Sequence, residues 1–276
     1  MRSAVRLALS NFLLGPELEQ NLAAIRQLVT AAAEQRADLI VFPEAAPTGL
    51  NNNDDPGHDL PLGTTIPGPI TERLERWAGG CGLWVVCGLL ERVGQTLYDS
   101  AVVFDSAGEL RLHYRRIQPQ WHGAQADPTV YRQGTAVAAC KSPWGRLSVL
   151  LCGDLFDDMV CEQTRAWRPD LLLVPLSRNF ADGALDQARW DRMELPTYME
   201  RVRRVGCTAA LVNELADRRT SDWPPFGGAW LADETGQLLA ARPLGCEGLL
   251  VVEIGPWQGM GAKARVLETK GIEPSI

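Results

Sequence analysis

Leu147-Ser148-Val149-Leu150-Leu151-Cys152-Gly153-Asp154 is an apolar run that ends abruptly on a thiol. The same pattern, ending on a carboxylate, occurs in Leu39-Ile40-Val41-Phe42-Pro43-Glu44. Short apolar runs of this kind predict buried strands. Binding and catalysis gather where the strands of α/β sheets end, because loops splay apart there and backbone groups are free. The two runs therefore predict an α/β fold that presents Cys152 and Glu44 at strand ends.

Around these two runs, apolar stretches alternate with segments of helical period. The predicted helices are Leu18–Gln35, Thr71–Ala78, Met159–Trp167 and Leu185–Val205. The predicted strands are Ala4–Leu9, Asp38–Phe42, Leu83–Leu90, Tyr98–Phe104, Glu109–Arg115, Leu147–Leu151, Leu171–Pro175, Thr208–Asn213, Gly228–Ala232 and Gly248–Ile254. Hairpins and β–helix–β units both occur in this order, which favours mixed sheets. Two sheets packed together, with helices outside, would cover strands that are apolar on both faces.

Composition narrows the class of protein. The 276 residues fit one large α/β domain, and 46% hydrophobic residues supply a sizeable core. A net charge of −7 argues against general binding to nucleic acid or to anionic membranes. No apolar stretch approaches the roughly 18 residues of a membrane span, and the N-terminal stretch reads as a strand, not as a secretory signal. The seven scattered cysteines lack CxxC spacing, so we expect a cytoplasmic protein without structural zinc or disulfides.

A thiol and a carboxylate at neighbouring strand ends suit nucleophilic catalysis, in which the carboxylate produces the thiolate. Taken singly, Cys152 also fits an inert core thiol and Glu44 a structural ion-pair partner. A Cys–His dyad with His113 or His122 is a further alternative. A redox-responsive pair of Cys152 with Cys161 is another.

The order of five motifs makes the combination much more specific, because it resembles the nitrilase (carbon–nitrogen hydrolase) superfamily. That family shows an early helix, a strand ending in Phe-Pro-Glu, a hairpin ending in Tyr-Arg-Lys, and a strand ending in Cys followed closely by Asp. The resemblance covers about Val5 to Ile254 and leaves a C-terminal tail, 255–276, within a single domain of 1–276. The matching motifs are Phe42-Pro43-Glu44, Tyr114-Arg115-Arg116, Trp144-Gly145-Arg146, Cys152-Gly153-Asp154-Leu155, and Val212-Asn213 with Phe226-Gly227-Gly228.

The resemblance assigns roles residue by residue. The family's general base falls on Glu44, its nucleophile on Cys152, and its lysine on Arg116. If Pro119-Gln120-Trp121 is matched to a family Pro-Asn-Tyr instead, the lysine position moves to Arg115. A second acidic residue that organises the site falls near Asp127, seven residues before Gly134.

The chain has three lysines, Lys141, Lys263 and Lys270, and none of them falls at either of these positions. An arginine therefore replaces the family lysine. A guanidinium can hold an oxyanion with fixed N–H donors. It cannot release a proton near neutral pH, so any proton-shuttling role of lysine is lost.

The resemblance implies a four-layer α-β-β-α sandwich that assembles as a homodimer. It implies hydrolysis of a non-peptide C–N bond, in a small-molecule amide or N-carbamoyl compound, through a thioester. Arg116 and backbone N–H groups near Phe156 or Arg178 would stabilise the oxyanion, with no metal and no organic cofactor. The alternative is a nitrilase-fold binding protein that is catalytically weak or inactive because Arg116 replaces the lysine.

Overall fold

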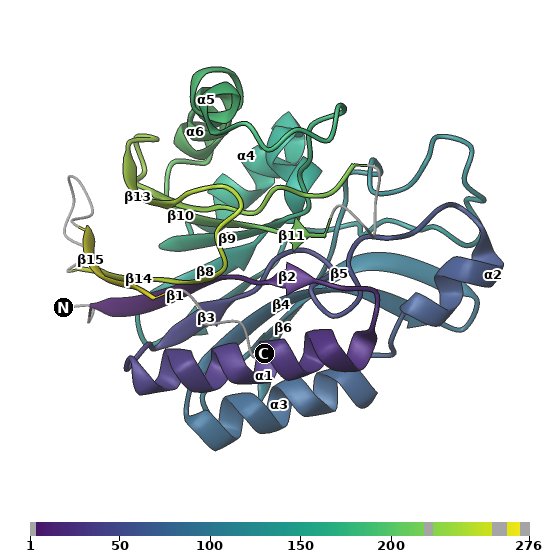
Figure 1. Ribbon diagram of the computed structural model, residues 1–276, viewed down its shortest axis with the longest axis horizontal. Helices are drawn as coiled ribbons and strands as arrows, with labels where there is room; N and C mark the ends of the chain where they lie inside the picture. The colour runs from purple at the N-terminus through teal and green to yellow at the C-terminus, as the bar shows by residue number, and fades with distance from the viewer. Residues whose placement is uncertain (1–3, 218–222, 256–263, 271–276) are drawn as a thin grey trace.

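Two β-sheets face each other at the centre of the molecule (Figure 1). The computed structural model describes residues 4–217, 223–255 and 264–270. In spatial order, the first sheet contains β15 (Ala264–Lys270), β14 (Gly248–Ile254), β1 (Val5–Asn11), β3 (Leu39–Val41), β4 (Trp84–Val93), β5 (Thr96–Phe104) and β6 (Leu110–Arg115). The second contains β13 (Leu238–Arg242), β12 (Ala229–Ala232), β10 (Thr208–Asn213), β9 (Leu171–Leu176), β8 (Gly145–Val149) and β7 (Ala139–Ser142). A short pair joins β2 (Leu13–Leu14) to β11 (Leu215–Ala216).

Helices cover the outer face of each sheet (Figure 1). The helices α1 (Leu18–Glu34) and α3 (Pro69–Cys81) lie beneath the first sheet, and α4 (Asp158–Trp167) and α6 (Leu195–Val205) lie above the second. Shorter helical segments are α2 (Pro56–Asp59), η1 (Leu60–Leu62), η2 (Cys152–Phe156), α5 (Gln187–Arg189) and η3 (Trp190–Glu194). The predicted four-layer α-β-β-α sandwich is therefore confirmed. Within the part of the chain that the structure describes, no helix combines the length and apolar character that a bilayer crossing requires.

The central strands are apolar on both faces because both faces are buried. In β1, Leu7 and Leu9 point into the core between the sheets, whereas Ala8 packs on the helical side with Leu22 and Ile25 of α1. Successive side chains of a strand alternate between its two faces. A strand that contacts a second sheet on one face and a helix on the other must therefore be apolar throughout, as the sequence indicated.

The predicted helix Leu185–Val205 is wrong in detail. Helical structure begins at Gln187 rather than Leu185, and the wider π-type turn η3 separates α5 from α6. Pro196 lies in the first turn of α6. Proline has no N–H to donate to the carbonyl four residues earlier, so an uninterrupted α-helical ladder cannot pass through it.

The loop that follows β3 connects the ends of both sheets. Phe42 and Ala46 continue the hydrogen bonding of this segment to β4, at 2.8 Å to the carbonyl of Val86 and 3.0 Å to that of Gly88. Glu44, between them, donates its backbone N–H to the carbonyl of Leu176 at the end of β9, over 3.4 Å. The loop that carries Glu44 is thereby held where the strands of the two sheets end.

Gly88 of β4 allows this loop to lie close to the sheet. A Cβ atom at Gly88 would lie 2.7 Å from Cα of Glu44, 2.8 Å from the carbonyl oxygen of Pro43 and 2.9 Å from the backbone N of Ala45. All three are backbone atoms, so no side-chain rotation relieves the overlap. The position of Glu44 therefore depends on a glycine in the neighbouring strand.

Replacing Gly88 by alanine is expected to lower the free energy of unfolding by ~1–3 kcal/mol, because the loop must shift as a unit. Urea-induced unfolding measures this loss. Gly80→Ala is the matched control, since Gly80 is exposed in α3 and a Cβ there meets no atom within 4 Å. Removing a helical glycine stabilises by roughly 0.5–1 kcal/mol. Equal unfolding midpoints for Gly88→Ala and wild type would contradict the proposed contact.

Candidate active site

Cys152 lies on a strained turn at the end of the segment that follows β8. Its φ angle of 40° is in the left-handed region, which is unfavourable for a residue with a Cβ atom. Ala45, next to Glu44, has a φ of 46°. Strained backbone of this kind is often found at functional sites, where the surrounding structure holds it in place. Cys152 as a whole residue is half-buried, whereas Glu44 is fully buried.

Asp154 holds the turn in position. Its side chain is buried and accepts hydrogen bonds from the backbone N–H groups of Leu151, Ile117 and Gln118 at 3.1, 3.0 and 2.8 Å. It also accepts a 2.7 Å hydrogen bond from the hydroxyl of Tyr114. Asp154 therefore connects the Cys152 turn to the segment after β6, which carries Arg116.

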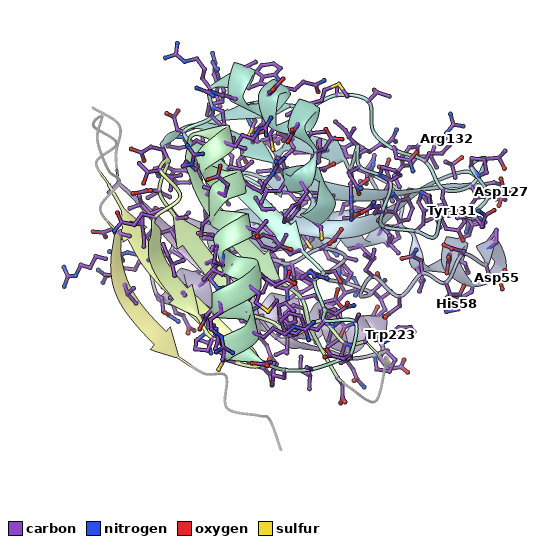
Figure 2. All side chains as sticks on the ribbon, turned by 90° about the horizontal axis from the view of Figure 1, so that it is seen from above. Asp55, His58, Asp127, Tyr131, Arg132 and Trp223 are labelled. Carbon is purple, nitrogen blue, oxygen red and sulfur yellow. The ribbon has the colours of Figure 1, made fainter. Side chains whose placement is uncertain are left out.

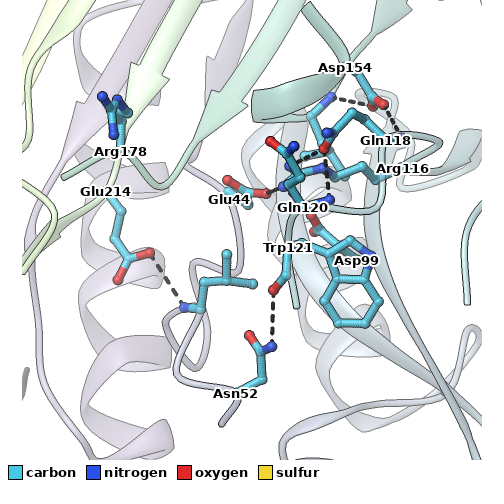
Figure 3. A network of polar contacts seen from close by, with 12 residues as sticks. Glu44, Asn52, Asp99, Arg116, Gln118, Gln120, Trp121, Asp154, Arg178 and Glu214 are labelled. Carbon is cyan, nitrogen blue, oxygen red and sulfur yellow. Dashed lines mark hydrogen bonds and ion pairs between the residues drawn. The ribbon is translucent and has the colours of Figure 1, made fainter. Parts of the chain in front are cut away.

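Arg116 lies at the centre of a buried polar network (Figure 3). Its Nη1 donates to Oε1 of Glu44 at 2.8 Å and to Oδ2 of Asp99 at 3.3 Å. Its Nη2 donates to Oε1 of Gln118 at 3.0 Å. One guanidinium thus connects the residue predicted as the base to a second buried carboxyl group.

The neighbouring Arg115 contacts a different set of residues. Its guanidinium forms an ion pair with Glu91 and lies over the ring of Tyr98, 3.9 Å from the ring centroid. His113 also contacts Glu91, at 2.8 Å. Arg116, not Arg115, is therefore the cation beside Glu44, and the His113 alternative does not lead to the Cys152 turn.

The electrostatic environment keeps the Cys152 thiol protonated at neutral pH. Burial raises the pKa of Cys152 to about 12, and the negative charge of Glu44 adds to this effect. Arg116 and the backbone N–H of Ser177 act in the opposite direction. For Arg116, burial acts to lower the pKa, but Glu44 and Cys152 outweigh it, so the pKa is raised and the charge is permanent. A nucleophilic Cys152 therefore needs a base that takes its proton.

Gly153 provides the space that the arginine occupies. A Cβ atom at Gly153 would overlap Nη2 of Arg116 and would lie 2.6 Å from Oε1 of Gln118. The backbone of Gly153 is outside the left-handed region, so its conformation alone does not require glycine. The missing side chain accommodates the second amino group of the guanidinium.

Three of the predicted supporting residues lie elsewhere or act differently. Asp127 is on an exposed turn at the edge of the molecule, where its side chain accepts hydrogen bonds only from Thr129 among the described residues (Figure 2). Counting back from Gly134 misplaced it, because the intervening loop departs from the family pattern. The backbone N–H of Arg178 donates to the side chain of Asn213 at 2.6 Å, and is therefore engaged. Phe156 packs the edge of its ring against Tyr198, with 4.8 Å between centroids.

Sequence reasoning missed Asp99, Ser177 and Glu214. Asp99 is a fully buried acidic residue of β5, and it contacts Arg116 directly. The backbone N–H of Ser177 faces the Cys152 sulfur, and its side chain hydrogen-bonds Glu214. Burial raises the pKa of Glu214 to about 7, although Ser177 and Leu50 act to lower it. The sequence did offer one signal for Asp99, namely a charged residue within a predicted strand.

Comparison with known proteins agrees with the observed fold. The description of the carbon-nitrogen hydrolase family matches residues 7–257. The chain belongs to the carbon–nitrogen hydrolase family, which confirms the predicted superfamily and, at the level of the family, the predicted class of hydrolase.

Named relatives include both nitrilases and amidases. An aliphatic nitrilase of Sinorhizobium fredii is 30% identical over 151 residues, which is 49% of this chain and 48% of that protein. A deaminated glutathione amidase of Yersinia enterocolitica is 24% identical over 86% of this chain and 82% of that protein. Among solved structures, an amidase from Nesterenkonia sp. AN1, determined as a double mutant in complex with acrylamide, has a TM-score of 0.74. The alignment covers 91% of each chain at 20% sequence identity, so the similarity is one of fold.

Gly153→Ala is expected to lower the free energy of unfolding by ~1–3 kcal/mol, because the new methyl group overlaps the guanidinium of Arg116. In an Arg116→Lys background, the same substitution should cost less, since lysine has no second amino group at that point. Urea unfolding of the wild type, both single variants and the double variant measures the coupling, expected at about 1 kcal/mol or more. An identical cost in both backgrounds would show that Gly153 does not make room for the arginine.

Proposed function

We propose that this protein hydrolyses a non-peptide C–N bond, in a small amide or N-carbamoyl compound, through a thioester on Cys152. The observation that carries the proposal is the strained turn of Cys152 beside a network in which Arg116 holds the buried carboxylate of Glu44. A nucleophile, a base and a fixed cation in one site suit acyl transfer. The family relatives, which are nitrilases and amidases, support the same reaction class.

In the proposed mechanism, Glu44 accepts the thiol proton as the sulfur of Cys152 attacks the carbonyl carbon. Arg116 and the backbone N–H of Ser177 stabilise the resulting oxyanion, since both lie beside the thiol. The C–N bond then breaks and ammonia or an amine leaves. Water, activated by Glu44, hydrolyses the thioester and restores the thiol. The thiol and the carboxylate supply the nucleophile and the base, so the mechanism requires no metal or organic cofactor.

A binding protein with little or no turnover is the second candidate function. It is favoured by one observation, the direct ion pair of 2.8 Å between Arg116 and Glu44. The guanidinium stays charged throughout and cannot pass on a proton. Turnover of a panel of small amides separates the two candidates.

The same resemblance leads us to propose a homodimer that acts in the cytoplasm. All seven cysteines are free thiols, which suits a reducing compartment. The acidic net charge of −7 gives no support to a nucleic-acid partner.

Cys152→Ala should abolish hydrolysis while leaving the fold intact, because the thiol is the proposed nucleophile. Release of ammonia from small amides and N-carbamoyl compounds measures activity. Intact-protein mass spectrometry detects the acyl group on Cys152 in the wild type. Cys140→Ala, at a thiol in the edge strand β7, is the matched control and should retain both signals. Hydrolysis by Cys152→Ala at the rate of the wild type would rule out the assigned nucleophile.

Arg116→Lys should raise turnover of small amides at least about tenfold, equivalent to roughly 1.4 kcal/mol of barrier. An ammonium can release a proton during the reaction, which a guanidinium cannot. It also frees the carboxylate of Glu44 from the forked guanidinium of Arg116. Steady-state kinetics on the same panel measures the gain. Arg116→Ala serves as the comparison: activity equal to that of the wild type in this variant would mean that the cation at this position has no role in turnover.

A further inference from the structure

Asp99 is the buried acidic group that the mechanism above leaves without a role. It lies in the middle of the first sheet's hairpin, on β5, and its side chain is fully buried. Glu44 and Asp99 accept hydrogen bonds from the same nitrogen, Nη1 of Arg116, at 2.8 and 3.3 Å. Two buried carboxyl groups therefore share one guanidinium.

The charges of Arg116, Glu44 and Asp99 balance only if one of the two carboxyl groups holds a proton. The guanidinium of Arg116 stays charged, so it compensates a single one of these carboxylates. A second buried carboxylate without a cation would cost several kcal/mol. The third buried carboxyl group nearby, Asp154, has donors of its own in three backbone N–H groups and the hydroxyl of Tyr114. Among the described residues, the other titratable groups that act on the cluster supply no positive charge: Cys152 from η2, Tyr114 from β6, Tyr198 from α6, and Glu214 after β10.

Each of the two carboxyl groups keeps one buried oxygen atom unpaired. Among the described residues, Oε2 of Glu44 and Oδ1 of Asp99 are buried and have no hydrogen-bond donor. The two side chains are within hydrogen-bonding reach of each other. One proton between two acceptors turns one of them into a donor and satisfies both. Consistently, burial and the neighbouring Glu44 raise the pKa of Asp99 well above its ordinary value, although Arg116 acts against them.

We propose that Asp99 is a positioning residue that shares one proton with Glu44, so that the pair carries a single negative charge opposite Arg116. The shared proton orients the carboxylate of Glu44 and fixes the charge of the base. Its catalytic consequence rests on the function proposed above, whereas the presence of the shared proton does not.

The proton balance of the reaction then closes without any change in Arg116. As the sulfur of Cys152 bonds to the carbonyl carbon, the thiol proton moves to the pair, which becomes neutral with two protons. Breaking the C–N bond returns one proton to the leaving nitrogen. A water molecule next gives a proton to the pair as its oxygen bonds to the acyl carbon. The C–S bond breaks, the sulfur takes this proton, and the pair again holds one.

Infrared spectroscopy of the full chain at neutral pH tests the shared proton directly. A protonated carboxylic acid absorbs in a carbonyl region that carboxylates and amides leave clear. We expect Asp99→Asn and Glu44→Gln each to remove the same acid band, because the remaining carboxyl group then pairs alone with Arg116 and ionises. Glu91→Gln is the matched control, because Glu91 is a buried carboxyl group that Arg115 keeps ionised at neutral pH, so its removal should leave the acid band unaltered.

Two spectroscopic results would overturn the proposal. Loss of only a carboxylate band in Asp99→Asn would mean that Asp99 is ionised. Persistence of the acid band in Glu44→Gln would mean that Asp99 holds its own proton without sharing it. Circular dichroism of each variant confirms that the fold is retained before the spectra are compared.

Kinetics supplies a readout that a purely structural role would not change. At high pH the wild-type pair loses its shared proton, and the second negative charge disfavours attack, so kcat/KM should fall on the alkaline side. Asp99→Asn has no such proton, so this alkaline limb should disappear while kcat at neutral pH falls about tenfold and KM stays the same. A pH profile of the same shape as that of the wild type would overturn the positioning role.

If the wild type hydrolyses no amide at all, the proposed function fails, and the infrared spectra still decide whether the proton is shared.

Discussion

The permanent positive charge of Arg116, buried between two carboxyl groups, is the constraint on which the site depends. A guanidinium away from water must be compensated by negative charge. Glu44, Asp99 and Gln118 accept from it, and Gly153 leaves space for it. Removing any one of these features would affect the others, because all of them contact the same planar group.

The fold brings these residues together by ending both sheets at the same place. Glu44 follows β3 of the first sheet, and Cys152 follows β8 of the second. The backbone hydrogen bond from Glu44 to Leu176, at the end of β9, joins the two sheets there, and Asp154 ties the Cys152 turn to the segment that carries Arg116. The strain at Cys152 is therefore supported from both sheets.

Local pattern predicted the sheets and helices and two candidate site residues, whose roles came from the family resemblance. Apolar runs identified the buried strands, and their abrupt ends identified Glu44 and Cys152. Asp127 was misplaced because its position came from counting along a loop of unusual sequence. Asp99 was missed because an acidic residue in a hairpin strand reads as exposed, and only the tertiary structure supplies the arginine that allows its burial. The prediction of one continuous helix over Leu185–Val205 was too regular. Hydrophobic periodicity does not show that Pro196 is unable to donate a backbone hydrogen bond.

Substituting arginine for lysine changes which group can move protons. The thiol of Cys152, with its pKa raised to about 12, does not ionise by itself at neutral pH, so proton transfer must accompany attack. Lysine is able to take part in that transfer, and a guanidinium is not. In this chain the proton transfer therefore has to be carried out by the carboxyl groups that Arg116 holds. A second carboxyl group beside the base then becomes useful, because it can keep one proton while Glu44 exchanges another. The acidic residue at position 99 and the arginine at position 116 are thus best understood as one electrostatic unit.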